Sequence, residues 1–369
     1  MKKSTQTFYG VLRGAGQVMF QPGLACSLLF LAGILWGAWC SGRMAIFWGA
    51  AAGLLAAHLT GRMLRLKRTD GRDGLWGFNG ILVGCAVMTF LRPGPVSWAV
   101  LLFGAAATVW VREAMNRVLA SWRINSLTMP FVLTTWFLLA AAHMLRALHP
   151  DSLAAPALAV PLATQVDTGW LNLCIYTMKG IAQVFLIDNG ITGLLFLLGL
   201  ACSNGWSALW ALVASALSLG LALLFGASGA AVAAGLYGYS PVLTGIALGS
   251  IFYPPSWRTA LWALAGVVMT FFVQAAMNTA LDPVGIPTLT APFCLTTWLF
   301  LLPPLKSLFA PPHAGKPSHA PSAAAAAESR ASDHSDWSRA RKPHLPAATS
   351  RPPAAPEGKK RTHKGSETR

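Results

Sequence analysis

Charged residues are scarce in this sequence, and acidic residues are the scarcest of them. Asp, Glu, Lys and Arg make up 11% of the 369 residues, whereas hydrophobic residues make up 54%. Soluble domains carry about 25% charged residues, so this composition excludes an ordinary soluble domain. Asp188 is the one charged residue between Ile181 and Ala230. Apolar runs of about 20 residues cross a bilayer as helices, and these runs lack the alternation of a barrel strand. We predict an all-α polytopic membrane protein.

Clusters that could carry chemistry are also missing. The six cysteines form no Cys-x-x-Cys pair, and no His, Cys, Asp and Glu cluster has metal-ligand or catalytic spacing. The Gly-x-Gly strings lack the strand–turn–helix context of a nucleotide site. We therefore expect no cofactor, no metal, no disulfide and no enzyme activity.

The formal charge of +16 does not indicate nucleic-acid binding, because of where the charge lies. Twelve Lys or Arg and five Asp or Glu fall between Leu305 and Arg369, in a stretch rich in Pro, Ala and Ser. Such a composition is typical of disorder. We read residues 310–369 as a disordered, basic cytoplasmic tail and expect no nucleic-acid partner.

Ten apolar blocks are long enough to be read as membrane spans. We place them at Leu24–Cys40, Ala45–Leu59, Leu75–Leu91, Ser97–Val111, Leu127–Leu145, Gly190–Ser203, Ser207–Phe225, Ala231–Phe252, Thr259–Ala276 and Leu289–Leu308. With both termini in the cytoplasm, most Lys and Arg of the short loops fall inside, as the positive-inside rule requires. We expect a cytoplasmic N-terminus over 1–7, a first repeat over 8–147, an external linker over 148–170 and a second repeat over 171–309.

A shorter apolar stretch precedes each set of five spans. Phe8–Phe20 ends at Pro22-Gly23, and Cys174–Ile187 ends at Asp188-Asn189-Gly190. Short segments interrupted by Gly or Pro, at matching places in two halves, are typical of discontinuous helices that line a solute site. We predict two half-membrane helices.

The two halves of the chain repeat each other. The matching segments, at an offset of 161 to 166 residues, are Gly14–Val18 with Gly180–Val184, Gly74–Gly84 with Gly235–Gly245, and Leu127–Trp136 with Leu289–Trp298. With five spans in each half, the second half must enter the membrane from the opposite side. We predict two inverted repeats, each of five transmembrane helices plus one half-membrane pore helix.

These three motifs, present twice and in this order, resemble the urea transporter family, and in particular a bacterial urea channel. The resemblance covers roughly residues 10–308. It implies a multi-pass protein of the cell membrane, the inner membrane if bacterial, that assembles as a homotrimer with one pore per protomer. It also implies passive transport of urea, with short-chain amides as further candidate solutes, through a narrow pore with an oxygen ladder between aromatic slots. The expected partners are urea, membrane lipid and two further copies of the chain.

Gln17, Gln183, Thr128 and Thr290 are the expected members of the ladder. Removing an amide from water without replacement partners costs several kcal/mol, so a urea pore needs oxygen acceptors along the solute's edge. Gln and Thr side chains supply them. Alternatively, each Gln ties a broken helix to its neighbour, and each Thr bonds a carbonyl freed by Pro130 or Pro292.

Apolar and aromatic residues are expected to form the flat walls of the pore. Phe78 and Leu82 lie four residues apart and share a helix face, as do Tyr239 and Leu243. The resemblance places these pairs at the two ends of the filter and adds three further lining residues, Phe20, Val184 and Leu186. Tyr239 stands where Phe is common. Leu186 aligns with Phe20, so the second slot is lopsided unless Phe185 or another residue fills it.

Three other readings remain. An ion- or proton-coupled secondary transporter of a small neutral solute would also have inverted repeats, but it needs an ion site within the membrane. A channel for ammonia, water or glycerol lacks support, because Asn-Pro-Ala repeats and paired intramembrane histidines are missing. A membrane assembly protein without transport activity is the third.

Overall fold

The computed structural model describes residues 3–157 and 165–303, and over these residues its regular structure is helical. One isolated bridge joins Leu91 to Pro150. The first half forms α1 (Lys3–Gln17), α2 (Leu24–Cys40), α3 (Ala45–Met63), α4 (Arg68–Arg72), α5 (Phe78–Phe90), α6 (Pro95–Leu119), η1 (Ala120–Trp122) and α7 (Met129–Ala142). The all-α prediction is confirmed for the described part of the chain.

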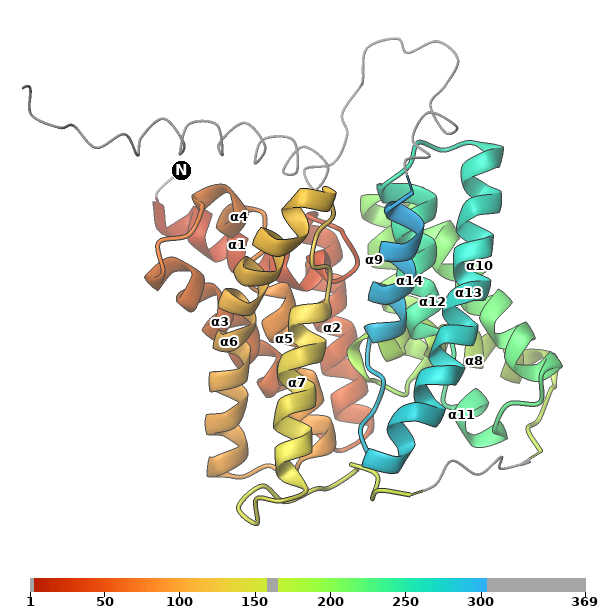
Figure 1. Cartoon of the computed structure of the whole chain (residues 1–369), viewed down its shortest axis with the longest axis horizontal. Helices are drawn as coiled ribbons and strands as arrows, with labels where there is room; N and C mark the ends of the chain where they lie inside the picture. Colours follow the sequence, from red (N-terminus) through yellow and green to blue (C-terminus); the bar gives the residue numbers. More distant parts are fainter. Residues whose placement is uncertain (1–2, 158–164, 304–369) are drawn as a thin grey trace, which may run out of the picture. The chain divides into compact units, whose positions relative to one another are not determined.

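The second half forms a matching series of helices. These are α8 (Trp170–Ala182), η2 (Gln183–Phe185), α9 (Gly190–Ser203), α10 (Gly205–Leu224), α11 (Gly229–Ala233), α12 (Tyr239–Ile246), a π-helical turn η3 (Ala247–Ile251), α13 (Trp257–Leu281), η4 (Asp282–Val284) and α14 (Ala291–Leu301). The two halves meet where α2 packs along α9 (Figure 1). The predicted tail over 310–369 lies outside the described residues.

Every predicted span overlaps a helix, and α2 and α9 match their predicted bounds. The stretch Ala231–Phe252 is the clear difference, because it is broken rather than continuous. Its first part is α11 and its second part is α12 with η3. Gly235 causes the break, since its φ of +72° belongs to the left-handed region that favours glycine.

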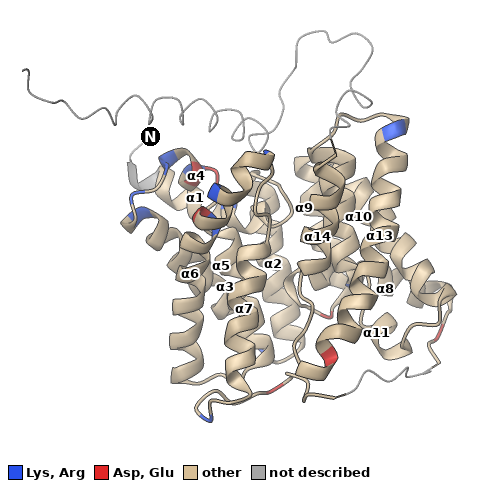
Figure 2. Ribbon diagram, in the orientation of Figure 1, with Lys and Arg blue, Asp and Glu red and all other residues tan. Residues whose placement is uncertain are grey.

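Several helices have the length and polarity of membrane spans. Three of the described helical segments are long and apolar enough to cross a bilayer, and a fourth arises if the bent pair Trp170–Phe185 and Gly190–Ser203 is one span. Large apolar side chains are exposed on these and other helices, among them Trp39 on α2, Trp48 on α3 and Phe103 on α6 at 71%, 58% and 63% exposure. Lys and Arg gather near α1 and α4, and the helix bodies carry few charges (Figure 2). Such a surface fits lipid rather than water.

Both predicted short segments end in a sharp change of direction. α1 stops at Gln17 and the chain turns at Phe20, whose φ is +63°. In the second half, η2 is followed by Leu186 with a φ of +58°, and the segment ending at Phe185 is bent by 75° from α9. Bulky residues rarely adopt positive φ, so the surrounding packing holds both turns in place.

Left-handed backbone occurs at matching places in the two halves. Of eleven residues with positive φ in the described part of the chain, ten form pairs at an offset of 161 to 166 residues. The pairs are Phe20 with Leu186, Arg65 with Gly226, Gly74 with Gly235, Arg123 with Gly285, and Leu127 with Leu289. The loops of the two halves therefore bend alike, even where their residue types differ.

Glycines let α3 and α5 approach until their backbones touch. A Cβ added at Gly84 would overlap the backbone oxygen of Gly49, and one added at Gly80 would overlap that of Gly53. Small residues at helix interfaces are the usual means of close packing in lipid, where apolar burial supplies little driving force. This contact holds α5, which carries Phe78 and Leu82.

Gly84→Ala is expected to destabilise the protein by about 1–3 kcal/mol, because the new methyl group meets backbone that cannot move aside. Gly220→Ala is the matched control, since it is also a helical glycine and a Cβ there meets nothing within 4 Å. Thermal unfolding of the detergent-solubilised variants measures the difference. An equal midpoint for the two variants would contradict the tight α3–α5 contact.

Candidate functional site

Gln17 and Gln183 hold equivalent positions at the ends of the two short helices. The Gln17 Nε2 donates to the carbonyl of Asp73 at 2.7 Å, and the Gln183 Nε2 donates to that of Ala234 at 2.8 Å. Each side chain is 8% exposed, and neither Oε1 accepts a hydrogen bond from a described residue. The amide nitrogen thus ties the broken helix to its neighbouring loop, as the alternative reading expected, and leaves the oxygen free.

A cation on each short helix strengthens the same attachment. Arg13 donates to the carbonyl of Arg72 at 3.1 Å, and Lys179 donates to that of Ala233 at 3.1 Å. Lys179 also pairs with Asp188 at 2.8 Å. These acceptors directly precede the carbonyls that hold the two glutamines. We did not single out either cation from the sequence, although both lie four residues before a predicted ladder Gln.

Thr128 and Thr290 meet directly, one from each half of the chain. Their Oγ1 atoms lie 2.6 Å apart, and the side chains are 3% and 2% exposed. They are the N-caps of α7 and α14, and the residue before each has positive φ. The Thr128 Oγ1 also lies 3.3 Å from the Sγ of Cys294. Neither hydroxyl bonds a carbonyl freed by proline.

Two tryptophans exchange hydrogen bonds between the halves around this threonine pair. The Trp136 indole on α7 donates to the carbonyl of Pro287 at 2.8 Å, and the Trp298 indole on α14 donates to that of Asn125 at 2.9 Å. The donors and the acceptors each differ by 162 in number. Each half thereby holds the loop that leads into the other half's Thr. The tryptophans lie in the repeated motif, but its spacing alone does not reveal this exchange.

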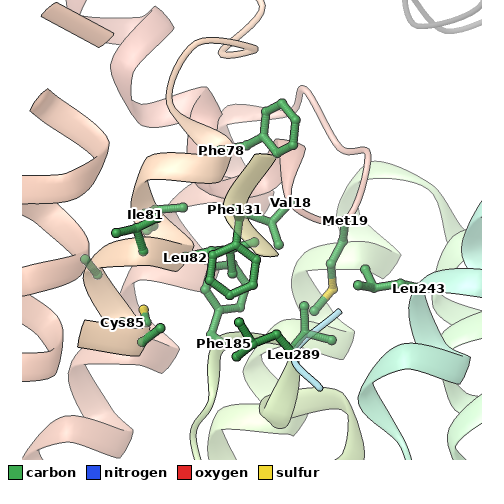
Figure 3. Close-up of a cluster of buried hydrophobic side chains, with 14 of the residues drawn as sticks. Val18, Met19, Phe78, Ile81, Leu82, Cys85, Phe131, Phe185, Leu243 and Leu289 are labelled. Carbon is green, nitrogen blue, oxygen red and sulfur yellow. The ribbon is translucent and has the colours of Figure 1, made fainter. Parts of the chain in front are cut away.

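The predicted wall residues lie in a shared apolar cluster with little accessible surface. Leu82 and Leu243 are 0% exposed, Val184 is 1% and Phe78 is 8% exposed. Figure 3 shows side chains from both halves in this cluster, among them Met19, Leu243 and Leu289. The predicted wall residues are thus closely packed in this conformation.

Tyr239 is half-buried at the start of α12, and its hydroxyl bonds the Oγ1 of Thr288 at 2.9 Å. Thr288 lies in the loop that leads to Thr290. The Tyr239 hydroxyl is therefore bonded to that loop.

Phe20 lies among aromatic residues contributed by the second half. Its ring makes edge contacts with Phe252 at 5.9 Å and with Phe293 at 6.2 Å between centroids. Leu186 has the matching backbone turn and is also half-buried. Phe293 stands in the Pro-Phe step of the third motif, so the repeated Phe was a signal for it, whereas no motif marks Phe252.

Phe185 does not take the place that Phe20 has in the first half. It is 0% exposed, and its ring contacts Phe30 and Phe196 at 5.8 and 5.1 Å. These two partners lie on α2 and α9, where the halves meet. Phe185 therefore does not supply the ring that Leu186 lacks at the second turn.

A further group of charged side chains lies where α4 meets α6. Arg112 bonds Asp70 at 3.1 Å and Glu113 at 2.8 Å, so α6 holds α4 in place. Burial raises the pKa of the nearby Asp73 carboxyl, and Arg13 opposes that shift. No group of His, Cys, Asp and Glu among the described residues has the geometry of a metal site.

Comparison with known proteins agrees with the repeated motifs. The sequence model of the urea transporter family matches residues 8–304. Urea transporter 1 of sheep (Ovis aries) is 31% identical over 296 residues, which cover 79% of this chain and 76% of that protein. Urea transporter 1 of goat (Capra hircus) has the same identity and coverage. Urea transporter 1 of rat (Rattus norvegicus) is 29% identical over 299 residues, again 79% and 76%.

These relatives are mammalian, so they bear on the family and not on the bacterial branch to which we likened the motifs. The matched region contains every residue that we predicted to line a pore. Together with the apolar helices, the match identifies a multi-pass membrane protein that acts in transport and is not an enzyme. The chain belongs to the urea transporter family.

Proposed function

We propose that this chain is a passive channel for urea across the cell membrane. The observation that carries the proposal is the paired set of oxygen atoms that both halves supply. Gln17 and Gln183 keep a free Oε1 while their nitrogens are bonded to loops, and Thr128 and Thr290 meet between the halves. A row of acceptors suits a flat solute whose edges carry N–H donors.

The proposed pore combines this row with apolar walls. Its lining residues are Gln17, Phe20, Phe78, Leu82, Thr128, Gln183, Val184, Leu186, Tyr239, Leu243 and Thr290. Leucine and aromatic walls exclude hydrated ions, because they replace none of the water that an ion must lose. Leu82 and Leu243 are fully buried in the described conformation, so a solute would reach them only after side chains of the cluster move.

We further propose that the two halves are inverted repeats that share one pore. The paired positive-φ residues support this arrangement, and so do the reciprocal bonds of Trp136 and Trp298. The domain bounds 8–147 and 171–309 follow, with an external linker whose residues 158–164 lie outside the described part. Cytoplasmic termini follow from the basic loops. The homotrimer and its lipid contacts rest on the family resemblance.

Urea flux is expected to persist when ion gradients and membrane potential are abolished, since a passive pore needs no coupled ion. Stopped-flow shrinkage of proteoliposomes in symmetric buffer with ionophores measures it. Bare liposomes give the lipid leak. Strict dependence on a proton or sodium gradient would favour the coupled transporter instead. Flux equal to the lipid leak would favour an assembly role.

Gln17→Met and Gln183→Met should each slow urea flux about fivefold, because each removes an oxygen worth about 1 kcal/mol to the passing solute. Gln274→Met is the matched control. Its Nε2 also bonds a loop carbonyl, that of Leu236, but it lies on α13 outside the proposed row.

Thermal stability separates the two roles of these glutamines. A ladder role predicts reduced flux in Q17M and Q183M beyond any loss that Q274M produces at similar stability. If all three variants lose flux in proportion to stability, the glutamines act as anchors alone and the ladder assignment is wrong.

A further inference from the structure

Cys294 breaks the symmetry between the halves at the point where the two threonines meet. It lies one helical turn after Thr290 on α14, and its side chain is fully buried. The equivalent residue on α7, at an offset of 162, is Val132, which is also fully buried. A valine has no hydrogen-bonding atom, whereas a thiol is a weak donor and a weak acceptor. The threonine pair thus has a polar neighbour on one side.

The contacts of Cys294 favour an acceptor role for its sulfur. The Sγ lies 3.3 Å from the Oγ1 of Thr128, and Thr128 is the N-cap of α7. The backbone N–H groups at this end of α7 give it partial positive charge. Partial positive charge beside the sulfur favours its lone pairs as acceptors, so the Thr128 hydroxyl is the better donor of the two.

An O–H···O bond between two equivalent threonines has no inherent direction. Either hydroxyl can donate, and the remaining hydroxyl hydrogen is then free for another acceptor. A sulfur that accepts from Thr128 removes this ambiguity. In that arrangement the Thr128 O–H points to the Cys294 Sγ, and the Thr290 O–H is the donor to the Thr128 Oγ1 in the 2.6 Å contact, whose direction the atom positions alone leave open.

We propose that Cys294 is a positioning residue that takes up the Thr128 hydroxyl hydrogen, so that the threonine pair offers only acceptors to a solute. This inference rests on the proposed urea pore. With both hydroxyl hydrogens bonded inside the protein, only oxygen lone pairs remain for the passing molecule. A threonine pair that offers only acceptors favours solutes with N–H donors on both edges. Urea has amino groups on both edges, whereas acetamide has the same flat shape with a methyl group in place of one of them.

The test is the ratio of urea flux to acetamide flux in proteoliposomes. Cys294→Val should lower this ratio about two- to threefold, as expected for a hydrogen bond at the weak end of the range. Cys294→Ser keeps an acceptor and should retain the wild-type ratio. Cys26→Val is the matched control, because Cys26 is an equally buried thiol on α2 with no threonine contact in the described residues.

Two results would overturn the assignment: an unchanged ratio in C294V, or an equal fall in C294V and C294S. A uniform loss of both fluxes with the ratio preserved would show a packing role and also overturn it. If the wild-type protein passes no urea, the proposed function itself has failed.

A spectroscopic measurement tests the hydrogen bond without transport. The difference infrared spectrum of wild type and C294V isolates the S–H band of Cys294, and Thr128→Val should shift that band by removing the hydroxyl that donates to the sulfur. An unshifted band would mean that the Thr128 hydrogen lies elsewhere, which would also overturn the proposal.

Discussion

The requirement that every polar backbone group find a partner inside the membrane determines most of this structure. A helix that ends within a bilayer leaves N–H and C=O groups without intrahelical partners, and lipid supplies none. Helices α1, α7, α8 and α14 end among buried residues of this chain. The loops before α7 and α14 receive hydrogen bonds from Trp298 and Trp136, and Gln17 and Gln183 donate to the carbonyls that follow α4 and α11. The same requirement explains why oxygens gather at the centre of an otherwise apolar protein.

A second consequence is that the amide nitrogen and the amide oxygen of each glutamine have different roles. An amide carries donors on nitrogen and acceptors on oxygen, so one side chain can hold the backbone and face a solute at once. The two readings that the sequence allowed for Gln17 and Gln183 are therefore not exclusive. The bonds to Asp73 and Ala234 also orient the oxygen, since an amide is planar.

Much of the fold could be predicted from periodicity and repetition, because apolar length and motif spacing are local properties. The bounds of α2 and α9 and the two short helices were predicted in this way. Contacts between the halves could not, because they depend on how two distant segments dock. The 2.6 Å contact of Thr128 with Thr290 and the burial of Phe185 between α2 and α9 are of this kind. The break at Gly235 was missed because hydrophobicity outweighed a single glycine in our placement of the span.

The differences between the two halves bear on the proposed function as much as their similarity does. Ten of the eleven positive-φ residues in the described part of the chain have a partner at the matching place in the other half, so the loops of the two halves bend alike. Side chains at the same turns differ: Phe20 against Leu186, Phe78 against Tyr239, and Cys294 against Val132. In the proposed pore, a solute meets matching acceptors from the two halves but different walls. Under the proposed inverted repeat, the symmetry of the backbone therefore supplies the row of oxygens. The differing side chains mean that a solute contacts different residues when it enters from one side than when it enters from the other. The net flux stays passive in both directions.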